Sequence, residues 1–283
     1  MRYDENVLTD QTGRMLLRSF CSTVPEGDRK FWEHHHAECE LSTVLSGSGI
    51  YRVQGQDYSF SPGDVFLFHG EEVHCLMKVS GSFSLLNIRF EPRLLWSDAD
   101  EFAALQILFA RNDRFENRID SKNPKTAWLH DEIIALHEEL KQQQDGFRLM
   151  TKYKLYAMLI TLVRSYHYVD RNADYMRFQG TVQPMERALS YMEENLDKPI
   201  RLADIAAEAA MSPAYFSVMF KKMNGLTPWE YLSIKRVERA ISLLKSSNQT
   251  KLEIALSCGF SSSSNFYKIF KRITGKNPGD YQL

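Results

Sequence analysis

An internal repeat near the end of the chain most constrains its fold. The segment Leu202-x-x-Ile205-Ala206 recurs 49 positions later as Lys251-x-x-Ile254-Ala255. Two copies are too few for a solenoid, which needs about three or more stacked units, so the repeat predicts one compact unit used twice. After a one-residue insertion near Ser261 to Ser264 the offset is 50, and further positions match: Phe220-Lys221, Gly225, Pro228 and Tyr231 recur as Phe270-Lys271, Gly275, Pro278 and Tyr281.

Each copy has the pattern of two short helices joined by a tight turn. In the first copy, Ser212 and Pro213 are typical of an N-cap and a first helical position, which predicts a second helix over 214–223. In the second copy, Gly259-Phe260 marks the turn. Residues 229–244 are predicted to form a continuous helix that acts as a rigid spacer. Held in this way, the second helices of the two pairs could enter successive major grooves on one face of a DNA duplex.

The first ninety residues have a different period. Short segments rich in aromatic and aliphatic residues alternate with turns rich in Gly, Pro and Ser, which is typical of a closed or sandwiched β structure. After Pro124 the period becomes helical, with a break at 142–146 and a second helix from about Phe147 to Tyr168. This second helix is apolar on more than one side. It fits burial within its own domain or contact with a second subunit equally well.

These patterns predict an α+β multidomain protein, with an N-terminal β-barrel and accessory helices before an all-α domain. The expected parts are a sensor barrel at 1–98, a helical accessory or dimerisation segment at 99–169, a linker at 170–182 and a double helix-turn-helix domain at 183–283. A hydrophobic share of 43% and a charged share of 25% are those of an ordinary globular chain.

Charge is divided unevenly along the chain. Residues 182–283 contain 14 Lys and Arg against 10 Asp and Glu, whereas the rest contains 21 against 26. A positive C-terminal part suggests a polyanionic partner, although a small excess is also common on a solvated surface.

Because no apolar run has the length of a signal peptide or membrane span, we expect a cytoplasmic protein with no membrane partner. Four widely separated cysteines favour reduced thiols: Cys21, Cys39, Cys75 and Cys258.

Residues 30–90 contain histidines at a recognisable spacing. The pattern His34-x-His36-x-x-x-Glu40-x6-Gly47, followed by Pro62-Gly63-Asp64 and His74, resembles the two motifs of the cupin superfamily of small β-barrels. In metal-dependent cupins the matching residues bind a divalent metal, which implies His34, His36, Glu40 and His74 here. Three imidazoles and a carboxylate suit zinc, iron, manganese or nickel. In regulatory cupins these positions commonly line a metal-free pocket, so we expect no required cofactor and keep a divalent metal as the alternative.

A metal-free pocket of this composition suits a polar small molecule such as a sugar. The hydroxyls of a sugar need donors and acceptors, and its ring faces are apolar. For each aromatic residue taken alone, packing inside the barrel is the simpler alternative. The residues expected to line the pocket are His34, His36, Glu40, Tyr51, Arg52, Phe66, Phe68 and His74.

The repeat itself resembles the AraC/XylS family of bacterial transcription regulators over about one hundred residues. The matching motifs are Ile205-Ala206, Ser212-x-x-Tyr215-Phe216-Ser217, Phe220-Lys221 and Gly225-x-Thr227-Pro228, then Ile254-Ala255-x-x-x-Gly259-Phe260, Asn265-Phe266 and Phe270-Lys271. A cupin-type sensor before this unit is similar to the sugar-responsive branch, and His34-His35-His36 with Glu40 is similar to the rhamnose regulators. Lys235 and Ser261 to Ser264 depart from the family pattern, which leaves the operator sequence open.

The resemblance implies which residues meet DNA. The base-reading positions are Ala214, Ser217 and Val218 in the first recognition helix and Ser263, Ser264, Asn265 and Lys268 in the second. Since Asn265 can pair with adenine and Lys268 with guanine, we predict that the second helix discriminates more between sequences. Phosphate contacts, with ordinary solvation as the alternative for each, are expected from Lys221, Lys222, Arg236, Lys271, Arg272 and Lys276.

The combined prediction is a sequence-specific DNA-binding transcription regulator, expected to be an activator and not an enzyme. A sugar or related metabolite bound in the cupin barrel would control it. Expected partners are double-stranded DNA, the effector, RNA polymerase and a second copy of the chain. The alternatives are a metal-dependent cupin enzyme or a metal sensor joined to a DNA-binding domain. The sequence names neither the effector nor the operator.

Overall fold

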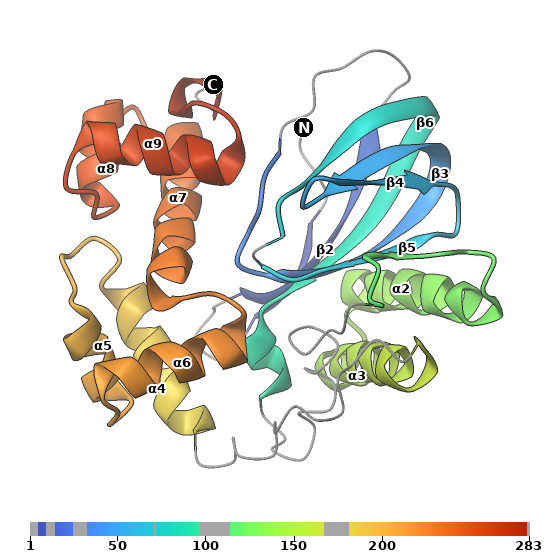
Figure 1. The fold of residues 1–283 in the computed structure, drawn as a ribbon, viewed down its shortest axis with the longest axis horizontal. Helices are drawn as coiled ribbons and strands as arrows, with labels where there is room; N and C mark the ends of the chain where they lie inside the picture. Colours follow the sequence, from blue (N-terminus) through green and yellow to red (C-terminus); the bar gives the residue numbers. More distant parts are fainter. Residues whose placement is uncertain are drawn as a thin grey trace. The chain divides into compact units, whose positions relative to one another are not determined.

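The computed structural model describes residues 5–9, 15–24, 33–70, 72–96, 114–166 and 181–281. They form two compact units, the first built on an antiparallel sheet and the second built of helices, to which the short non-helical segment 33–37 is also assigned (Figure 1). This confirms the predicted α+β class with its β domain first. The predicted linker at 170–182 falls mostly on residues 167–180, which lie outside the described residues, as does the stretch 99–113 of the predicted accessory segment.

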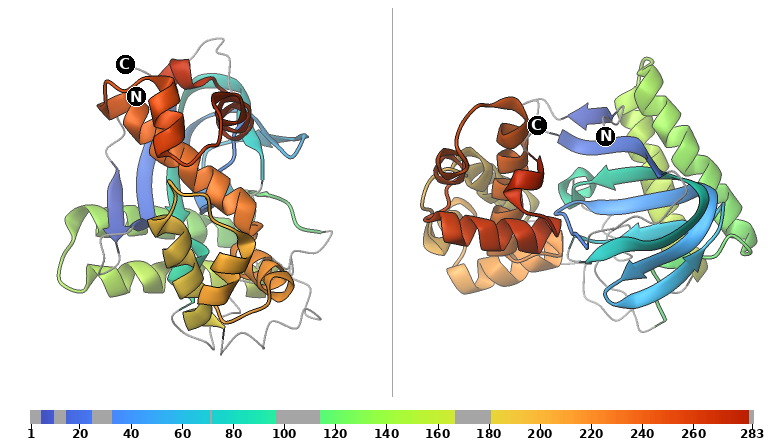
Figure 2. Two further views of the ribbon diagram at one scale, coloured as in Figure 1. Left: turned by 90° about the vertical axis from the view of Figure 1, so that its left-hand side faces the viewer. Right: turned by 90° about the horizontal axis from the view of Figure 1, so that it is seen from above.

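The sheet of the first unit is antiparallel at every pairing in the described part. Its order is β1-β2-β6-β3-β5-β7, with β4 paired to β3. The long strands β3 and β6 shift register at three places, and such irregularities let a sheet bend, as the curved strands of Figure 2 show. The strands are β1 (Asn6–Thr9), β2 (Met15–Val24), β3 (Cys39–Val53), β4 (Gln56–Phe60), β5 (Val65–Phe68), β6 (His74–Phe90) and β7 (Arg118–Ile119). A short 3-10 helix, η1 (Pro92–Leu95), follows β6, and β7 extends the sheet beyond residue 98.

Two helices complete the first unit, close to where the sequence predicts them. α2 (Pro124–Gln142) starts behind the N-cap Asn123, whose side chain accepts from the Lys125 N–H, and α3 runs over Phe147–Tyr166. α2 lies against five of the strands, and α3 packs on α2 (Figure 1).

Two histidines of α2 bond to the sheet. His130 Nδ1 lies 2.7 Å from Thr43 Oγ1 on β3, and His137 Nδ1 lies 2.9 Å from Ser19 Oγ on β2. Both hydroxyls are fully buried. Because buried polar groups are costly without partners, these bonds fix α2 over two particular strands.

Asp64, in the predicted Pro62-Gly63-Asp64 motif, has a structural role. Its buried carboxylate accepts the backbone N–H groups of Ser61 at 2.9 Å and Ser121 at 2.7 Å. The left-handed backbone of Gly63, with φ of 87°, makes the tight turn before it. Asp64 thus joins the turn before β5 to the loop after β7.

The second unit repeats one arrangement, as the sequence predicts. The pairs α5 and α6, then α8 and α9, are separated by the long helix α7 (Figure 1). Ser212 and Ser262 cap the second helix of each pair and accept the N–H groups of Tyr215 and Asn265. The helices are α4 (Val182–Glu194), α5 (Leu202–Glu208), α6 (Pro213–Asn224), α7 (Pro228–Ser246), α8 (Lys251–Ser257), α9 (Ser263–Thr274) and the 3-10 helix η4 (Pro278–Tyr281). Aromatic residues from the second helix of each pair are fully buried: Phe216, Phe220, Phe266 and Phe270.

Candidate effector site and DNA-binding surface

Buried polar side chains from three neighbouring strands meet on one face of the sheet. Ser42 on β3 pairs with Asn87 on β6, and their side-chain oxygens are 3.2 Å apart. Ser42 Oγ also lies 2.7 Å from Glu40 Oε1, and Asn87 Nδ2 donates to Ser22 Oγ on β2 at 3.1 Å. The single hydroxyl hydrogen of Ser42 is shared between two acceptors, Glu40 Oε1 and Asn87 Oδ1, and these contacts together link β3, β6 and β2. These residues and Arg89 are called the polar cluster below.

The two charged residues of the polar cluster, Glu40 and Arg89, form an ion pair. Arg89 Nε donates to Glu40 Oε2 at 2.6 Å, and the Glu40 side chain is only 1% exposed. The Arg89 guanidinium also lies 5.2 Å from the centre of the Phe20 ring. A buried carboxylate with no partner would be very costly, so Arg89 is what permits Glu40 to be charged there.

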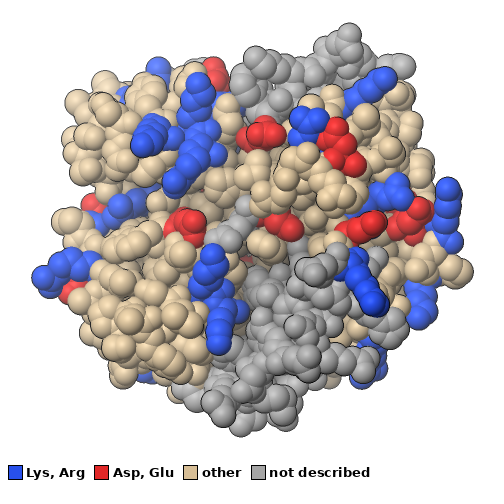
Figure 3. Space-filling view, viewed as in Figure 1, with Lys and Arg blue, Asp and Glu red and all other residues tan. Residues whose placement is uncertain are grey.

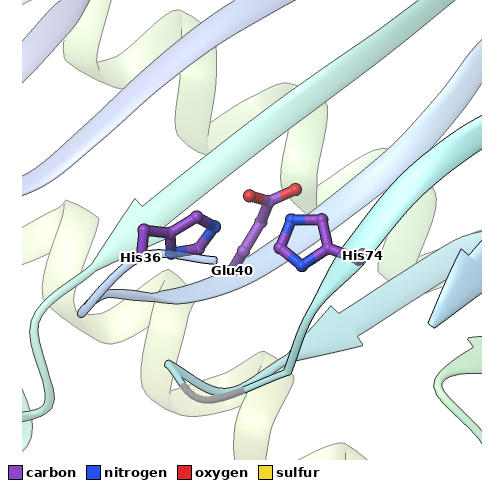
Figure 4. Close-up of side chains that lie close together, drawn as sticks. All are labelled: His36, Glu40 and His74. Carbon is purple, nitrogen blue, oxygen red and sulfur yellow. The ribbon is translucent and has the colours of Figure 1, made fainter. Parts of the chain in front are cut away.

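Two histidines flank the Glu40 carboxylate (Figure 4). Potential ligand atoms of His36, Glu40 and His74 all lie within 4.8 Å of one another, and all three residues are buried. His74 Nδ1 lies 2.7 Å from the Glu72 carbonyl oxygen and must donate to it, so in the neutral ring the lone pair is on Nε2. Bonding of this kind orients metal-binding histidines.

His34 is not part of this group. Its ring centre is 6.3 Å from that of His36, and its side chain is partly exposed. The structure therefore brings together three of the four residues predicted as metal ligands. Side chains two apart on a strand share one face, but β3 begins only at Cys39, so this alternation does not place His34 and His36 together.

The predicted aromatic residues form a packed wall beside His74. The Phe68 ring stacks on the His74 ring at 4.5 Å, and Tyr51 lies 5.1 Å from Phe66 and 5.7 Å from Phe68. All of them are buried, together with Phe60. Burial, with the nearby Glu40 charge, raises the pKa of Tyr51, so its hydroxyl stays protonated. Core packing, the simpler alternative for these rings, accounts for their contacts.

Arg52 lies on the other face of β3. Its Nε and Nη2 donate to the two carboxylate oxygens of Asp57 at 2.6 and 2.8 Å, and these hydrogen bonds lower the pKa of Asp57. Adjacent strand residues point to opposite faces, so with Tyr51 buried, Arg52 points away. The structure thus argues against the pocket position predicted for Arg52.

Recognition helix α6 presents few hydrogen-bonding groups. Ala214 and Val218 are exposed, and Ser217 is half-buried. The Ser217 hydroxyl donates to the Pro213 carbonyl oxygen at 2.9 Å, so its hydrogen is used within the helix. Of the predicted base-reading residues of α6, Ala214 and Val218 are therefore apolar, and Ser217 offers only its acceptor oxygen.

Recognition helix α9 presents a more polar face. Ser264, Asn265 and Lys268 are exposed, Ser263 is half-buried, and Phe266 is fully buried behind them. Figure 3 shows Lys and Arg side chains on the surface over α9. Asn265 and Lys268 are about one helical turn apart on α9, and their contact with neighbouring base edges stays a prediction.

Most residues predicted to bind phosphate are exposed at the ends of the recognition helices. Lys221 and Lys222 lie in the last turn of α6, and Lys271 and Arg272 in that of α9. Lys276 is half-buried, with its Nζ 5.9 Å from the centre of the Tyr281 ring.

Arg236 differs from these cations. It donates from Nε to the Leu196 carbonyl oxygen at 2.7 Å and from Nη2 to that of Lys198 at 2.8 Å. A guanidinium held by two carbonyls in the protein is poorly placed for DNA. This geometry argues against the phosphate contact predicted for Arg236.

Sequence reasoning missed Ser42, Asn87 and Arg89. The alternation in β6 puts Asn87 and Arg89 on one face, which the sequence does show. That this face meets Glu40 depends on the register of β3 against β6, where Glu40 pairs with Arg89. No local pattern specifies that register.

Comparisons with known proteins identify a ligand-binding domain in the N-terminal part of the chain and a DNA-binding domain in the C-terminal part. The AraC-like ligand binding domain matches residues 19–159, and a helix-turn-helix domain matches residues 205–283. The HTH-type transcriptional activator RhaR of Escherichia coli strain K12 is 26% identical over 252 residues, which cover 89% of this chain and 87% of RhaR.

Solved structures share the fold. ToxT from Vibrio cholerae aligns over 94% of this chain and 97% of its own, with a TM-score of 0.60 at 15% identity. ToxT bound to unsaturated fatty acid aligns with a TM-score of 0.55 at 14% identity, over 94% of each chain. Among the described residues, no helix is both long and apolar enough to span a membrane. With a ligand-binding domain followed by a double helix-turn-helix unit, the chain belongs to the AraC family of DNA-binding transcription regulators.

Proposed function

We propose that this protein activates transcription in response to a small polar effector bound beside the polar cluster. The observation that carries the proposal is the buried set of hydrogen bonds that joins Glu40, Ser42 and Asn87, together with the ion pair of Glu40 with Arg89. A β domain needs no such chain for stability, since apolar residues of similar volume would serve as well or better. Activation is supported by the name of the similar protein RhaR. An activator of this kind would contact promoter DNA and RNA polymerase in the cytoplasm.

The chemistry of the polar cluster supports a hydroxylated effector, such as a sugar or sugar acid. Asn87 and Ser42 offer both donors and acceptors, and Phe20 offers a ring face next to Arg89. ToxT has been solved with an unsaturated fatty acid, whose long chain needs an apolar channel. Buried ionic and amide groups make such a ligand a poorer match here.

A metal sensor is the second candidate function. It is favoured by the convergence of His36, Glu40 and His74 and by the bond that orients His74 through Glu72. The Arg89 guanidinium opposes it, because a cation 2.6 Å from Glu40 already neutralises the carboxylate that a metal would need.

Thermal denaturation separates these candidates. We expect a sugar or sugar acid to raise the melting temperature of the full chain, since ligand at 100 times its dissociation constant adds about 2.7 kcal/mol. Asn87→Ala should lose this shift, whereas Arg52→Gln, which lies outside the polar cluster, should keep it. A shift with zinc or manganese alone, together with stoichiometric metal by elemental analysis, would favour the metal sensor. A shift with fatty acids alone would exclude the hydroxylated class.

We also propose that the protein forms a dimer through α3. Side chains near the start of this helix are exposed although apolar: Leu149 at 59%, Met150 at 47% and Tyr153 at 63%. They lie within about one turn on one side of α3, while Leu155 and Leu159 are buried on another. A contiguous exposed apolar patch of this kind is typical of an interface.

Charge placed on this face of α3 should separate the subunits. We expect the double variant Leu149→Glu with Tyr153→Glu to sediment as a monomer at concentrations where the unaltered protein is a dimer. Its melting temperature at low concentration should be unchanged, because both side chains are exposed. Gln144→Glu adds charge just before the helix and should leave the dimer intact. Dimeric sedimentation of the double variant would rule out this interface.

A further inference from the structure

Arg236 joins separate parts of the DNA-binding unit. It lies in the middle of α7, the spacer between the two helix-turn-helix pairs. Its two hydrogen bonds end on Leu196 and Lys198, in the loop that leads from α4 into the first pair. The planar fork of a guanidinium bonds two carbonyls in a fixed orientation, which a lysine ammonium does not.

Gly259, the turn residue of the second pair, packs against the same contact. The contact of Arg236 with Leu196, Lys198 and Gly259 is called the joint below. Its φ is 78°, in the left-handed region. A Cβ at this position would lie 2.1 Å from the Leu196 carbonyl oxygen and 2.9 Å from Arg236 Nε. The turn between α8 and α9 therefore rests directly on Arg236 and on the carbonyl that Arg236 binds. The guanidinium of Arg236 therefore links the spacer helix α7 to the loop before α5 and to the turn between α8 and α9.

The first copy of the repeat shows that this contact is not simply inherited from the repeated unit. Arg187 on α4 precedes Arg236 by 49 positions, the offset of the repeat, and Ala210, with φ of 53°, precedes Gly259 by the same 49. Arg187 Nε donates to the Glu208 carbonyl oxygen at 3.0 Å, within its own copy. Arg236 instead reaches from α7 across to the loop between α4 and α5 of the first copy.

We propose that Arg236 is a positioning residue that sets the placement of α6 relative to α9 and so the spacing of the two DNA half-sites. Two recognition helices on one face of a duplex must match grooves about 34 Å apart. A joint held by two charge-assisted hydrogen bonds and a close glycine contact resists rotation of one helix pair about α7. Without the joint, each recognition helix can still read its own half-site, but binding depends less strongly on the spacing between the two half-sites.

The test uses the full chain and a duplex that it selects from a randomised library. From this duplex, a series is made with one or two base pairs inserted or removed between the half-sites, and binding is measured at several salt concentrations. We expect Arg236→Lys to reduce the preference for the selected spacing by about tenfold, as for loss of one charge-assisted hydrogen bond. The salt dependence of binding should not change, because the charge is kept.

Controls distinguish positioning from phosphate contact. Arg239→Gln removes a positive charge from an exposed position of α7 and should leave the spacing preference unaltered. Arg236→Gln should relax the preference as Arg236→Lys does; if it does not fold, by circular dichroism, Arg236→Lys decides alone. Wild-type spacing preference in Arg236→Lys would overturn the proposal. So would a uniform loss of affinity at every spacing in Arg236→Gln, with a salt slope smaller by about 0.9, as for one lost phosphate contact.

Discussion

Alanine at both Asn265 and Lys268 is expected to remove most of the discrimination between operator and random DNA. Each good contact to a base edge contributes about 1 to 3 kcal/mol, so the pair should lower the specificity ratio by about 30-fold or more. Both side chains are exposed on α9, and the Phe266 side of the helix is untouched. Surface changes of this kind usually leave stability within about 0.5 kcal/mol, so the loss would not reflect unfolding.

The measurement compares binding to the selected duplex and to a scrambled duplex at one salt concentration. Ser217→Ala on α6 is the matched control, because the Ser217 hydroxyl already donates to the Pro213 carbonyl. We expect that control to change the ratio less than about threefold, a small fraction of one base contact. A ratio that survives in the α9 double variant, or falls further in the α6 variant, would mean that α6 is the main reader.

Glu40→Gln is expected to destabilise the sheet domain by about 3 kcal/mol, since it leaves the Arg89 charge, whose side chain is only 15% exposed, without its carboxylate. The side chain keeps its size, so the cost is electrostatic. We expect the double variant Glu40→Leu with Arg89→Met to lose less stability than Glu40→Gln alone, because it removes both charges together. Hydrogen exchange at β3 and β6 amides, followed in denaturant, measures the stability of this domain separately from that of the helical unit.

Asp57→Asn is the control for the electrostatic cost, because it breaks the exposed pair with Arg52 and should change stability by no measurable amount. If the double variant proved less stable than Glu40→Gln, the ion pair would be a net source of stability. The polar cluster would then need no effector to explain it.

The helical unit could be predicted almost to the residue, because its signals are local. Ser212 with Pro213 marks the start of α6, and the aromatic spacing of Phe266 and Phe270 gives the buried side of α9. The sheet was predicted only as short strands. Tyr51 and Arg52 stand next to each other, and alternation shows that only one faces inward without showing which one.

Contacts between distant segments were beyond the reach of sequence patterns. Glu40 meets Arg89 because two long strands pair in one register, and a shift by one residue would turn Arg89 to the other face. Arg236 has the charge and helical position of a DNA-binding residue, and only the path of the loop at Leu196 and Lys198 shows where its guanidinium is bound.

The hydrogen bonds beneath α2 have a consequence for how this protein can evolve. On β3, Ser42 belongs to the polar cluster, while the next residue, Thr43, bonds to His130 on α2, the helix that supports α3. Under the two proposals above, neighbouring positions of one strand would serve ligand recognition and subunit assembly. We therefore expect substitutions at Ser42 that adapt the domain to a new metabolite to affect the adjacent Thr43–His130 hydrogen bond under α2 as well. Changes in ligand preference and in self-association should therefore arise together among descendants of this protein.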